Sequence, residues 1–461
     1  MDPHRIGRTV KKKSSAALSE TGNGIYLVAL GCPKNFVDSE VIAGSLAAAG
    51  WLLVPEPEEA SLYVVNTCAF LPQARAEAMR ELAAACEWKA ADPGRRKVVA
   101  AGCLAEYDRN RGDAKRELPA VDLWLRPDDI ARLPELLSGG GGRAAGSGER
   151  PTWLYNEKTP RMILTLPHLG ALKIADGCCN CCSYCSIPSI RGALRSRDSA
   201  SVVREARQLL DCGVREITLL AQDITAFGHD TGESLAGLLR KLDRLPGDFV
   251  LRLLYTHPAH YTEELIDVIA DSPKVLPYID IPLQHISDPI LKAMNRHTTR
   301  SAIEALISRL RERIPHLTLR TTFITGLPGE GEKEFAELAE FIRDTRFERM
   351  GVFTFAPEPG TPAAAMADQV PAAVAEERAQ LLMRRQTARM RRFHKSLIGS
   401  RMRVIIDLID GDWAVGRGAM DAPEIDNRIF LPRRRGMTPG GFRWVEVTGT
   451  RGNDLLGKAV K

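Results

Sequence analysis

A cluster of five cysteines is the part of the chain best suited to chemistry. The stretch "DGCCNCCSYCSIPSIRG", residues 176 to 192, contains Cys178, Cys179, Cys181, Cys182 and Cys185. Clustered thiols in a chain that lacks a secretory signal more often bind metal or react than form disulfides. Three kinds of site come into question: a zinc site, a redox-active CxxC pair and an iron-sulfur cluster.

The spacing of the cysteines separates these alternatives. Cys179/Cys182 and Cys182/Cys185 supply CxxC pairs for zinc, but the next cysteine downstream is the isolated Cys212, whereas a structural zinc site needs a second pair. A thioredoxin-like CxxC has no need for five thiols. The CxxxCxxC spacing of Cys178, Cys182 and Cys185 suits three ligands of a 4Fe-4S cluster. Three protein ligands would leave one iron open for catalysis.

A second group of thiols follows strand-like runs near the N-terminus. The runs "IYLVAL", "SLYVV" and "KVVAA" alternate with helix-like segments, which predicts a small parallel α/β domain. Cys32, Cys68 and Cys103 each follow one run within about three residues. Because the carboxyl ends of parallel strands meet at one edge of a sheet, we expect these thiols to share a site. The alternative is that they are small core residues, as we expect for Cys86 and Cys212.

The rest of the chain supplies the elements that must position these thiols. A flexible tail (1–24) precedes the first α/β domain (25–137), and the Gly-rich "SGGGGRAAGSGER" marks a linker (138–152). From 161 to 395, strand-like runs alternate with long helices, which predicts a parallel sheet in a partial or full (β/α) barrel. Short strand-like runs between turns predict a small antiparallel β-barrel over 396–461.

Composition sets the broad class of the protein. The 461 residues are 44% hydrophobic and 26% charged, with a net charge of +5, which does not by itself argue for a nucleic-acid partner. No apolar run reaches the ~18 residues of a membrane span, and the N-terminus lacks the apolar segment of a secretory signal. We therefore expect a cytoplasmic protein without a membrane partner.

The loop spacing, with Tyr184 in the aromatic position, resembles the CxxxCx-aromatic-C signature of the radical S-adenosylmethionine (SAM) superfamily. The resemblance implies that the open iron binds SAM, that the reduced cluster cleaves it to a 5'-deoxyadenosyl radical, and that Tyr184 lies near the adenine. It also implies that Gly326, in "TGLPGE", helps to line the SAM site. Gln222 and Asp223 follow a strand and are expected at the mouth of the barrel as cofactor-binding residues, although Asp223 is equally a candidate helix N-cap.

The order of the predicted domains resembles the methylthiotransferase family, which has an N-terminal methylthiotransferase domain, a radical SAM core and a TRAM domain. The resemblance implies that Cys32, Cys68 and Cys103 hold a second 4Fe-4S cluster, where the methylthio group is assembled or presented. One SAM would then supply the methyl group and another the radical. A sulfur donor and a reducing electron donor are the partners that this chemistry requires.

Cys179 and Cys181 depart from the family pattern. That family usually carries Asn and a basic or polar residue at these positions, as in "DGCNHRC". The extra thiols form alternative CxxC pairs that could capture iron or zinc in another register. We expect neither of them to be a ligand.

Several stretches distinguish the members that modify tRNA from the member that modifies ribosomal protein uS12. "LGCPKNFVDSE", "LLAQDITAFG", "YIDIPLQHISDPILKAMNRHTT", "RTTFITGLPGE" and "GRGAMDAPEIDNRIFL" resemble the latter. We therefore expect a methylthio group on the β-carbon of an aspartate in uS12, with a tRNA adenosine methylthiotransferase as the alternative. A non-catalytic, metal-stabilised RNA-binding protein is the alternative from another class. Asp421, Glu424 and Asp426 are expected to face a basic ribosomal protein.

Overall fold

The structure, a computed structural model, describes residues 23–109, 111–139 and 151–460. The chain forms two compact units. The N-terminal unit comprises Met1–Leu164, Ala175–Cys179 and Cys185–Arg197, and the C-terminal unit comprises Thr165–Ile174, Asn180–Tyr184 and Asp198–Lys461. The expected tail as far as residue 22, and the expected linker from 140 to 150, lie outside the described residues. Among the described helices, none combines the length and the apolar character of a membrane span.

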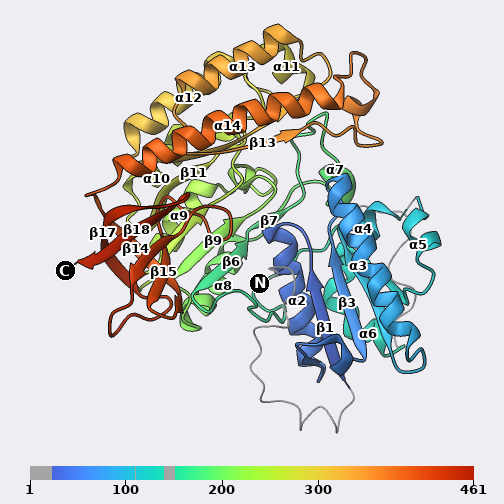
Figure 1. Ribbon diagram of the computed structural model, residues 1–461. Coiled ribbons are helices and arrows are strands. Elements are labelled where there is room, and N and C mark those ends of the chain that lie inside the picture. Colours follow the sequence, from blue (N-terminus) through green and yellow to red (C-terminus); the bar gives the residue numbers. More distant parts are fainter. Residues whose placement is uncertain (1–22, 110, 140–150, 461) are drawn as a thin grey trace. The chain divides into compact units, whose positions relative to one another are not determined.

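The N-terminal unit is built on a five-stranded parallel sheet with the order β2-β1-β3-β4-β5 (Figure 1). All residues of β1 and β3 are buried, because helices cover both faces of such a sheet. This explains why these strands are continuous apolar runs rather than alternating ones. The strands are β1 (Gly24–Ala29), β2 (Leu52–Leu53), β3 (Leu62–Thr67), β4 (Lys97–Gly102) and β5 (Leu123–Leu125), with a separate pair, β7 (Ala175–Asp176) and β8 (Arg195–Ser196).

Helices connect the strands of this sheet. Pro33 lies in the first turn of α2, where its missing N–H costs no hydrogen bond. On α3, Ala78, Leu82 and Ala85 are buried in the hydrophobic core, with Cys86 partly buried against it, as expected. The helices are α2 (Pro33–Ala48), η2 (Pro57–Glu59), α3 (Pro72–Ala90), α4 (Cys103–Tyr107), α5 (Asp113–Glu117), η3 (Pro127–Arg132), α6 (Leu133–Leu137) and α7 (Ile187–Ile190).

The C-terminal unit contains a six-stranded parallel sheet with the order β13-β12-β11-β10-β9-β6. The sheet is open, so it is the partial form of the expected (β/α) barrel. Parallel neighbours require crossover connections, which explains the alternation of strands and helices in this part of the sequence. The strands are β6 (Leu169–Lys173), β9 (Glu216–Leu220), β10 (Val250–Leu253), β11 (Val275–Asp280), β12 (Thr318–Thr325) and β13 (Arg349–Thr354).

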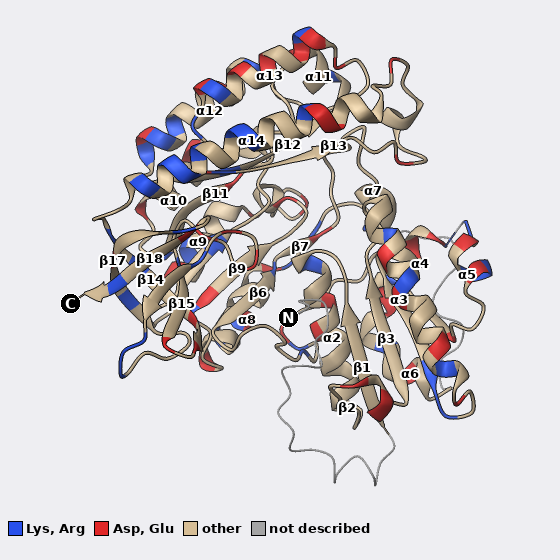
Figure 2. Cartoon of the chain, viewed as in Figure 1, with Lys and Arg blue, Asp and Glu red and all other residues tan. Residues whose placement is uncertain are grey.

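The crossover helices bury one face each. On α9, for example, Leu235, Leu238, Leu239 and Leu242 are buried at helical spacing. The long helix α14 packs along β13 and carries many Lys and Arg residues (Figures 1 and 2). The helices are α8 (Ser199–Asp211), η4 (Ile224–Ala226), α9 (Leu235–Asp243), η5 (Pro258–His260), α10 (Glu263–Asp271), α11 (Asp288–Ala293), α12 (Arg300–Arg313), α13 (Glu332–Asp344), η6 (Pro362–Ala365) and α14 (Ala372–Ser396).

The last part of the C-terminal unit is a closed five-stranded barrel, β14-β15-β16-β18-β17. We expected an antiparallel barrel, and all neighbours are antiparallel except β16 and β18. Strand directions cannot alternate around a closed ring with an odd number of strands, so one parallel pair is unavoidable. The strands are β14 (Arg401–Asp410), β15 (Trp413–Gly418), β16 (Ile429–Pro432), β17 (Phe442–Arg451) and β18 (Asp454–Val460).

The prediction that Cys212 belongs to the core is wrong, since its side chain is exposed. Helix α8 ends at Asp211, so Cys212 is the cap residue, followed by Gly213 in a left-handed conformation. The buried face of α8, which includes Val202, Ala206 and Leu209, therefore stops one turn before Cys212 would continue it.

Candidate metal centres and the strand-end site

Three cysteines lie at the carboxyl ends of neighbouring strands in the N-terminal unit. Cys32 is the N-cap of α2, which follows β1; Cys68 directly follows β3; and Cys103 is the first residue of α4, which follows β4. Because β1, β3 and β4 are adjacent in the sheet, the fold brings the three thiols to one edge. We call this group the strand-end site. Its role as a ligand set remains a prediction.

The thiols of the strand-end site are close enough to influence one another. Burial, and then the charges of Cys103 and Cys32, raise the pKa of the Cys68 thiol to about 12. Burial raises the pKa of Cys103 as well. Without metal the thiols of Cys68 and Cys103 are therefore protonated at neutral pH, and binding of iron would release their protons. The backbone at Gly31 (φ +91°) packs directly against Cys68, since a Cβ on Gly31 would lie 2.6 Å from the Cβ of Cys68.

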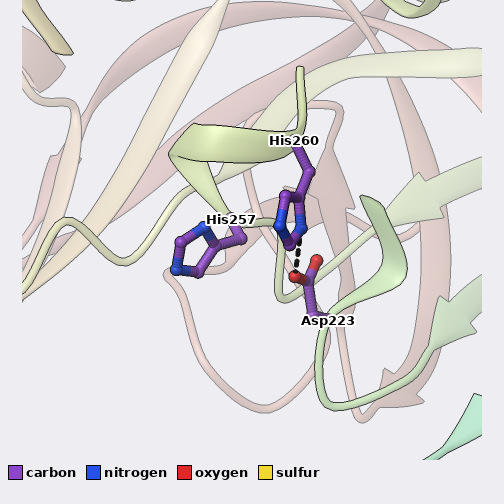
Figure 3. A group of neighbouring side chains, drawn as sticks. All are labelled: Asp223, His257 and His260. Atoms are coloured by element: carbon purple, nitrogen blue, oxygen red, sulfur yellow. Dashed lines mark hydrogen bonds and ion pairs between the residues drawn. The ribbon is translucent and has the colours of Figure 1, made fainter. Parts of the chain in front are cut away.

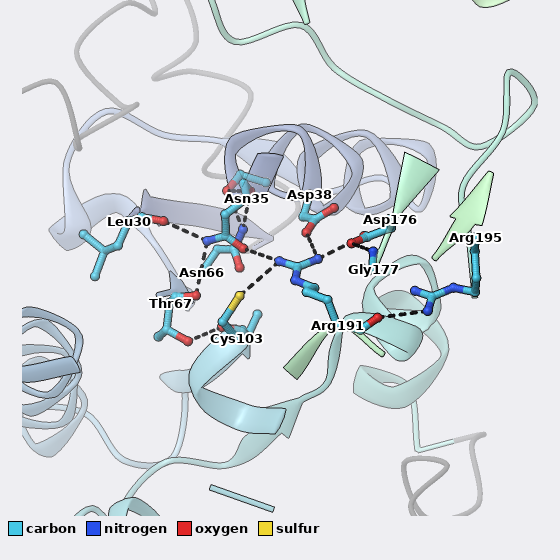
Figure 4. A network of polar contacts seen from close by, with 12 residues as sticks. Leu30, Asn35, Asp38, Asn66, Thr67, Cys103, Asp176, Gly177, Arg191 and Arg195 are labelled. Carbon is cyan, nitrogen blue, oxygen red and sulfur yellow. Dashed lines mark hydrogen bonds and ion pairs between the residues drawn. The ribbon is translucent and has the colours of Figure 1, made fainter. Parts of the chain in front are cut away.

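A buried polar network surrounds the strand-end site (Figure 4). Asn35 Nδ2 donates to the main-chain oxygens of Leu30 (2.7 Å) and Thr67 (3.2 Å). Asn66 Nδ2 donates to the main-chain oxygen of Asn35 (2.7 Å), and Thr67 Oγ1 accepts from the N–H of Leu104 (3.1 Å). These hydrogen bonds fix the carboxyl ends of β1, β3 and β4 in position against α2 and α4.

Sequence reasoning missed this network. The signal was available: Asn35 lies three residues after Cys32, and Asn66 lies two residues before Cys68, inside an otherwise apolar run. A buried amide needs hydrogen-bond partners, so an Asn at the end of a buried strand indicates a specific polar contact there.

The cysteine loop contributes to both compact units. Cys178, Cys179 and Cys185 belong to the N-terminal unit, and Cys181 and Cys182 belong to the C-terminal unit. Cys178, Cys182 and Cys185 are each partly buried, whereas Cys179 and Cys181 are exposed. Spacing along the chain is thus what assigns Cys178, Cys182 and Cys185 to one cluster, and this assignment remains a prediction.

The double change Cys179→Ser and Cys181→Ser is expected to leave SAM cleavage intact. Both side chains are exposed, and Asn295 Nδ2 holds the loop through the main-chain oxygen of Cys181 (2.9 Å), which serine retains. Release of 5'-deoxyadenosine by the anaerobically reconstituted protein measures the outcome. Loss of iron from this variant would mean that the cluster uses a different set of thiols.

Cys182 has a cationic neighbour within the C-terminal unit. Arg296, which is 4% exposed, places Nη1 3.7 Å from Cys182 Sγ and donates to the main-chain oxygen of Pro282. Arg296 thus offers a charged hydrogen-bond donor to the sulfur of Cys182. Tyr184 is partly buried against the apolar side chains of Ile290, Met294 and Leu327.

Asp223 and two histidines form a compact polar group in the C-terminal unit (Figure 3). Asp223 follows β9 and caps η4 by accepting from Thr225 N–H (2.9 Å), so the N-cap interpretation is confirmed. Its other oxygen contacts Asn180 Nδ2 and His260 Nδ1, each at 2.8 Å. Burial opposes the charge of Asp223, but His260, His257 and Thr225 outweigh it and lower its pKa to about 2.

The ligand atoms of Asp223, His257 and His260 lie within 4.8 Å of one another. One carboxylate and two imidazoles at this spacing could also hold a metal ion. The hydrogen bonds favour another role. Both Asp223 oxygens already accept bonds, and His257 Nδ1 accepts from Ala259 N–H (3.3 Å). Burial, and then Arg296, lower the pKa of His257 to about 3, so its neutral ring carries the proton on Nε2. That buried N–H finds no hydrogen-bond acceptor among the described residues.

The other two predicted cofactor contacts also follow strands. Gln222 is partly buried directly before Asp223. Gly326 follows β12 with φ +80°, and its N–H donates to Glu330 Oε2 (3.0 Å). A Cβ on Gly326 would collide with Ala375, so a glycine is required here for backbone geometry. The roles of Tyr184, Gln222, Asp223 and Gly326 toward SAM remain predictions.

The expectation that Asp421, Glu424 and Asp426 face a basic partner is wrong for two of the three. Asp421 is 1% exposed and pairs with Arg349 (2.5 Å), and Asp426 accepts a hydrogen bond from Tyr278 OH (2.6 Å). Only Glu424 of the three is exposed. Burial beside Arg349, on β13, satisfies the charge of Asp421 and Asp426 internally. These contacts join the barrel to the parallel sheet.

Three family models match successive parts of the chain. They are the uncharacterized protein family UPF0004 over residues 24–126, the radical SAM superfamily over 172–342 and the TRAM domain over 398–460. Among solved structures, the radical SAM methyltransferase TsrM of Kitasatospora setae has a TM-score of 0.55 at 16% identity and covers 84% of this chain and 79% of that one. At this identity the likeness concerns the fold alone. Together with the strand orders, these matches confirm the expected fold class.

Curated relatives cover nearly the whole chain. The ribosomal protein uS12 methylthiotransferase RimO of Akkermansia muciniphila is 43% identical over 450 residues, which cover 92% of this chain and 97% of that protein. The protein of the same name from Geotalea uraniireducens is 39% identical over 447 residues, with coverages of 95% and 98%. That from Opitutus terrae is 40% identical over 458 residues, with coverages of 94% and 96%.

Proposed function

Because the chain belongs to the ribosomal protein uS12 methylthiotransferase RimO family of radical SAM enzymes, we propose that it adds a methylthio group to the β-carbon of an aspartate in uS12. Family membership makes it an enzyme and implies SAM and a 4Fe-4S cluster as cofactors. The second cluster, the aspartate target, the cytoplasmic location and the sulfur and electron donors belong to the proposal. The observation that carries it is the gathering of Cys32, Cys68 and Cys103 at neighbouring strand ends.

Two sets of thiols hold the iron in this proposal. Cys178, Cys182 and Cys185 hold the first cluster, and the strand-end site holds the second. The bound groups supply one-electron cleavage of SAM at the first cluster and sulfur for the methylthio group at the second. The residues present fit these groups, because each set offers three thiols, and guanidinium groups approach two of the sulfurs, those of Cys182 and Cys103.

The remaining residues position reactants and exclude water. Asn35, Asn66 and Thr67 fix the strand ends, so the thiols of the strand-end site are preorganised. His257 offers its Nε2–H, at the carboxyl ends of β9 and β10, to an oxygen atom of a bound reactant. We expect Tyr184, Gln222, Asp223 and Gly326 to contact SAM.

Anaerobic reconstitution followed by iron and sulfide analysis tests the two-cluster model. About eight irons per chain are expected, because each cubane contains four. The variant in which Cys178, Cys182 and Cys185 are all replaced by alanine should retain about four. About four irons in the unsubstituted protein would refute the second cluster.

Mass spectrometry tests the substrate. In a strain that lacks the gene, uS12 should lose the mass of one methylthio group on a single aspartate, while methylthio-adenosine in total tRNA should be unchanged. The opposite result would identify a tRNA adenosine methylthiotransferase.

A further inference from the structure

Arg191 is a buried cation at the edge of the strand-end site (Figure 4). It is 3% exposed. Arg191 and its partners Asn35, Asp38, Cys103 and Asp176 all belong to the N-terminal unit. Nη1 contacts carboxylate oxygens of Asp38 (2.7 Å) and Asp176 (3.3 Å). Nη2 donates to Asn35 Oδ1 (3.0 Å) and to Cys103 Sγ (3.1 Å).

The two terminal nitrogens of the Arg191 guanidinium have different partners. Asp38 and Asp176 bind Nη1 and hold the side chain in place, and Asn35 fixes the direction of Nη2. The thiol of Cys103 is a weak acceptor while it is protonated, whereas a thiolate accepts a strong, charge-assisted hydrogen bond from a guanidinium. The arrangement therefore suits Cys103 as an iron ligand, because a metal-bound cysteine sulfur carries the charge of a thiolate.

We propose that Arg191 is a positioning residue that donates a hydrogen bond to the Cys103 sulfur of the second cluster and raises the reduction potential of that cluster. This inference rests on the proposed second cluster. One-electron reduction adds negative charge to a cluster, and a fixed cationic donor at a ligand sulfur stabilises the reduced form more than the oxidised form. Burial strengthens the effect, because little water screens the charge.

The position of Arg191 also connects the strand-end site to the cysteine loop. Asp176 lies two residues before Cys178, and Arg191 lies six residues after Cys185. Strands β7 and β8 pair these two flanks, with Asp176 opposite Arg195. One guanidinium thus ties both flanks of the loop to α2 and to Cys103 within the same compact unit.

The test isolates the second cluster in the full-length chain with Cys178, Cys182 and Cys185 replaced by alanine. In this background, Arg191→Met, Arg191→Lys and the control Arg195→Met are reconstituted, and the midpoint potential is measured by redox titration followed by EPR. Arg195 is a matched control, because it lies in the same segment but donates to the main-chain oxygens of Arg191 and Ala193.

Arg191→Met is expected to lower the ratio of reduced to oxidised cluster about tenfold at a fixed potential, which is a shift of ~59 mV for a one-electron couple. Arg191→Lys, which keeps a charge but loses the planar fork, should give a smaller shift in the same direction. Arg195→Met should leave the midpoint unchanged.

Each other outcome contradicts a specific statement. An unchanged midpoint in Arg191→Met with about four irons bound would overturn the role of Arg191. If Arg191→Met fails to retain its iron, Arg191→Lys decides, and a midpoint equal to that of the unsubstituted Arg191 would overturn the inference. If the background chain with Arg191 intact binds no cluster, the two-cluster proposal itself is refuted, and this inference with it.

Discussion

Replacing Cys103 with alanine is expected to abolish methylthio transfer to uS12 and to leave SAM cleavage close to that of the unsubstituted protein. Cys103 lies at the strand-end site, where it accepts from Arg191, and it has no place in the CxxxCxxC loop. Cys32→Ala and Cys68→Ala should behave in the same way. Cys178→Ala, Cys182→Ala and Cys185→Ala should instead abolish both reactions, because no radical forms without SAM cleavage.

Two assays on each variant separate these outcomes. Release of 5'-deoxyadenosine measures SAM cleavage, and the mass of uS12 measures methylthio transfer. Cys212→Ala is the control, since Cys212 is exposed at the end of α8 and should retain both activities. If loss of Cys103 also stopped SAM cleavage, the division of labour between the two sets of thiols would be wrong.

Replacing Arg417 with methionine is expected to destabilise the C-terminal unit by ~3–5 kcal/mol, because it leaves buried carboxylates without their partner. Arg417 contacts Asp407 (2.7 Å) and Glu216 (2.8 Å), and Arg252 also contacts Glu216 (2.6 Å). Burial alone would raise the pKa of Glu216, but Arg252 and Arg417 outweigh burial and lower it. Without Arg417, Asp407 and Glu216 must hold their charge beside fewer cations or take up a proton.

The measurement is the free energy of unfolding from the denaturation transition of this unit. Arg240→Met is the matched control, because Arg240 pairs with Glu264 at the surface, where both side chains are about half exposed. It should cost no more than ~1 kcal/mol. Equal effects of the two substitutions would contradict the assignment of Arg417 as a buried link between the barrel and the parallel sheet.

Much of the fold follows from local patterns in the sequence. The apolar runs before Cys32, Cys68 and Cys103 predict β1, β3 and β4, because strands buried on both faces need a continuous run of apolar residues. The alternation of strands and helices after residue 161 likewise predicts a parallel sheet, which the structure confirms. The shared offset of the three cysteines from their strands was sufficient to predict a common edge.

The errors concern the partners of two acidic residues and the end of one helix. Asp421 and Asp426 lie in an acidic stretch that reads as a recognition surface, but Arg349 and Tyr278, more than seventy residues away, bury them. Cys212 continues an apolar pattern, but α8 ends before it. Neither the partner of a charge nor the end of a helix is encoded in local periodicity alone.

The sequence by itself determined the order of the domains, the spacing of the cysteine loop and the placement of one thiol after each of three strands, because these depend on residue type and short-range periodicity. Only the tertiary structure decided that Arg191 contacts Cys103, that Asp223 contacts His260, and that Arg417 joins the barrel to the sheet. Each of these contacts joins residues 37 to 201 positions apart. Such contacts depend on how the elements pack, and no local pattern specifies that.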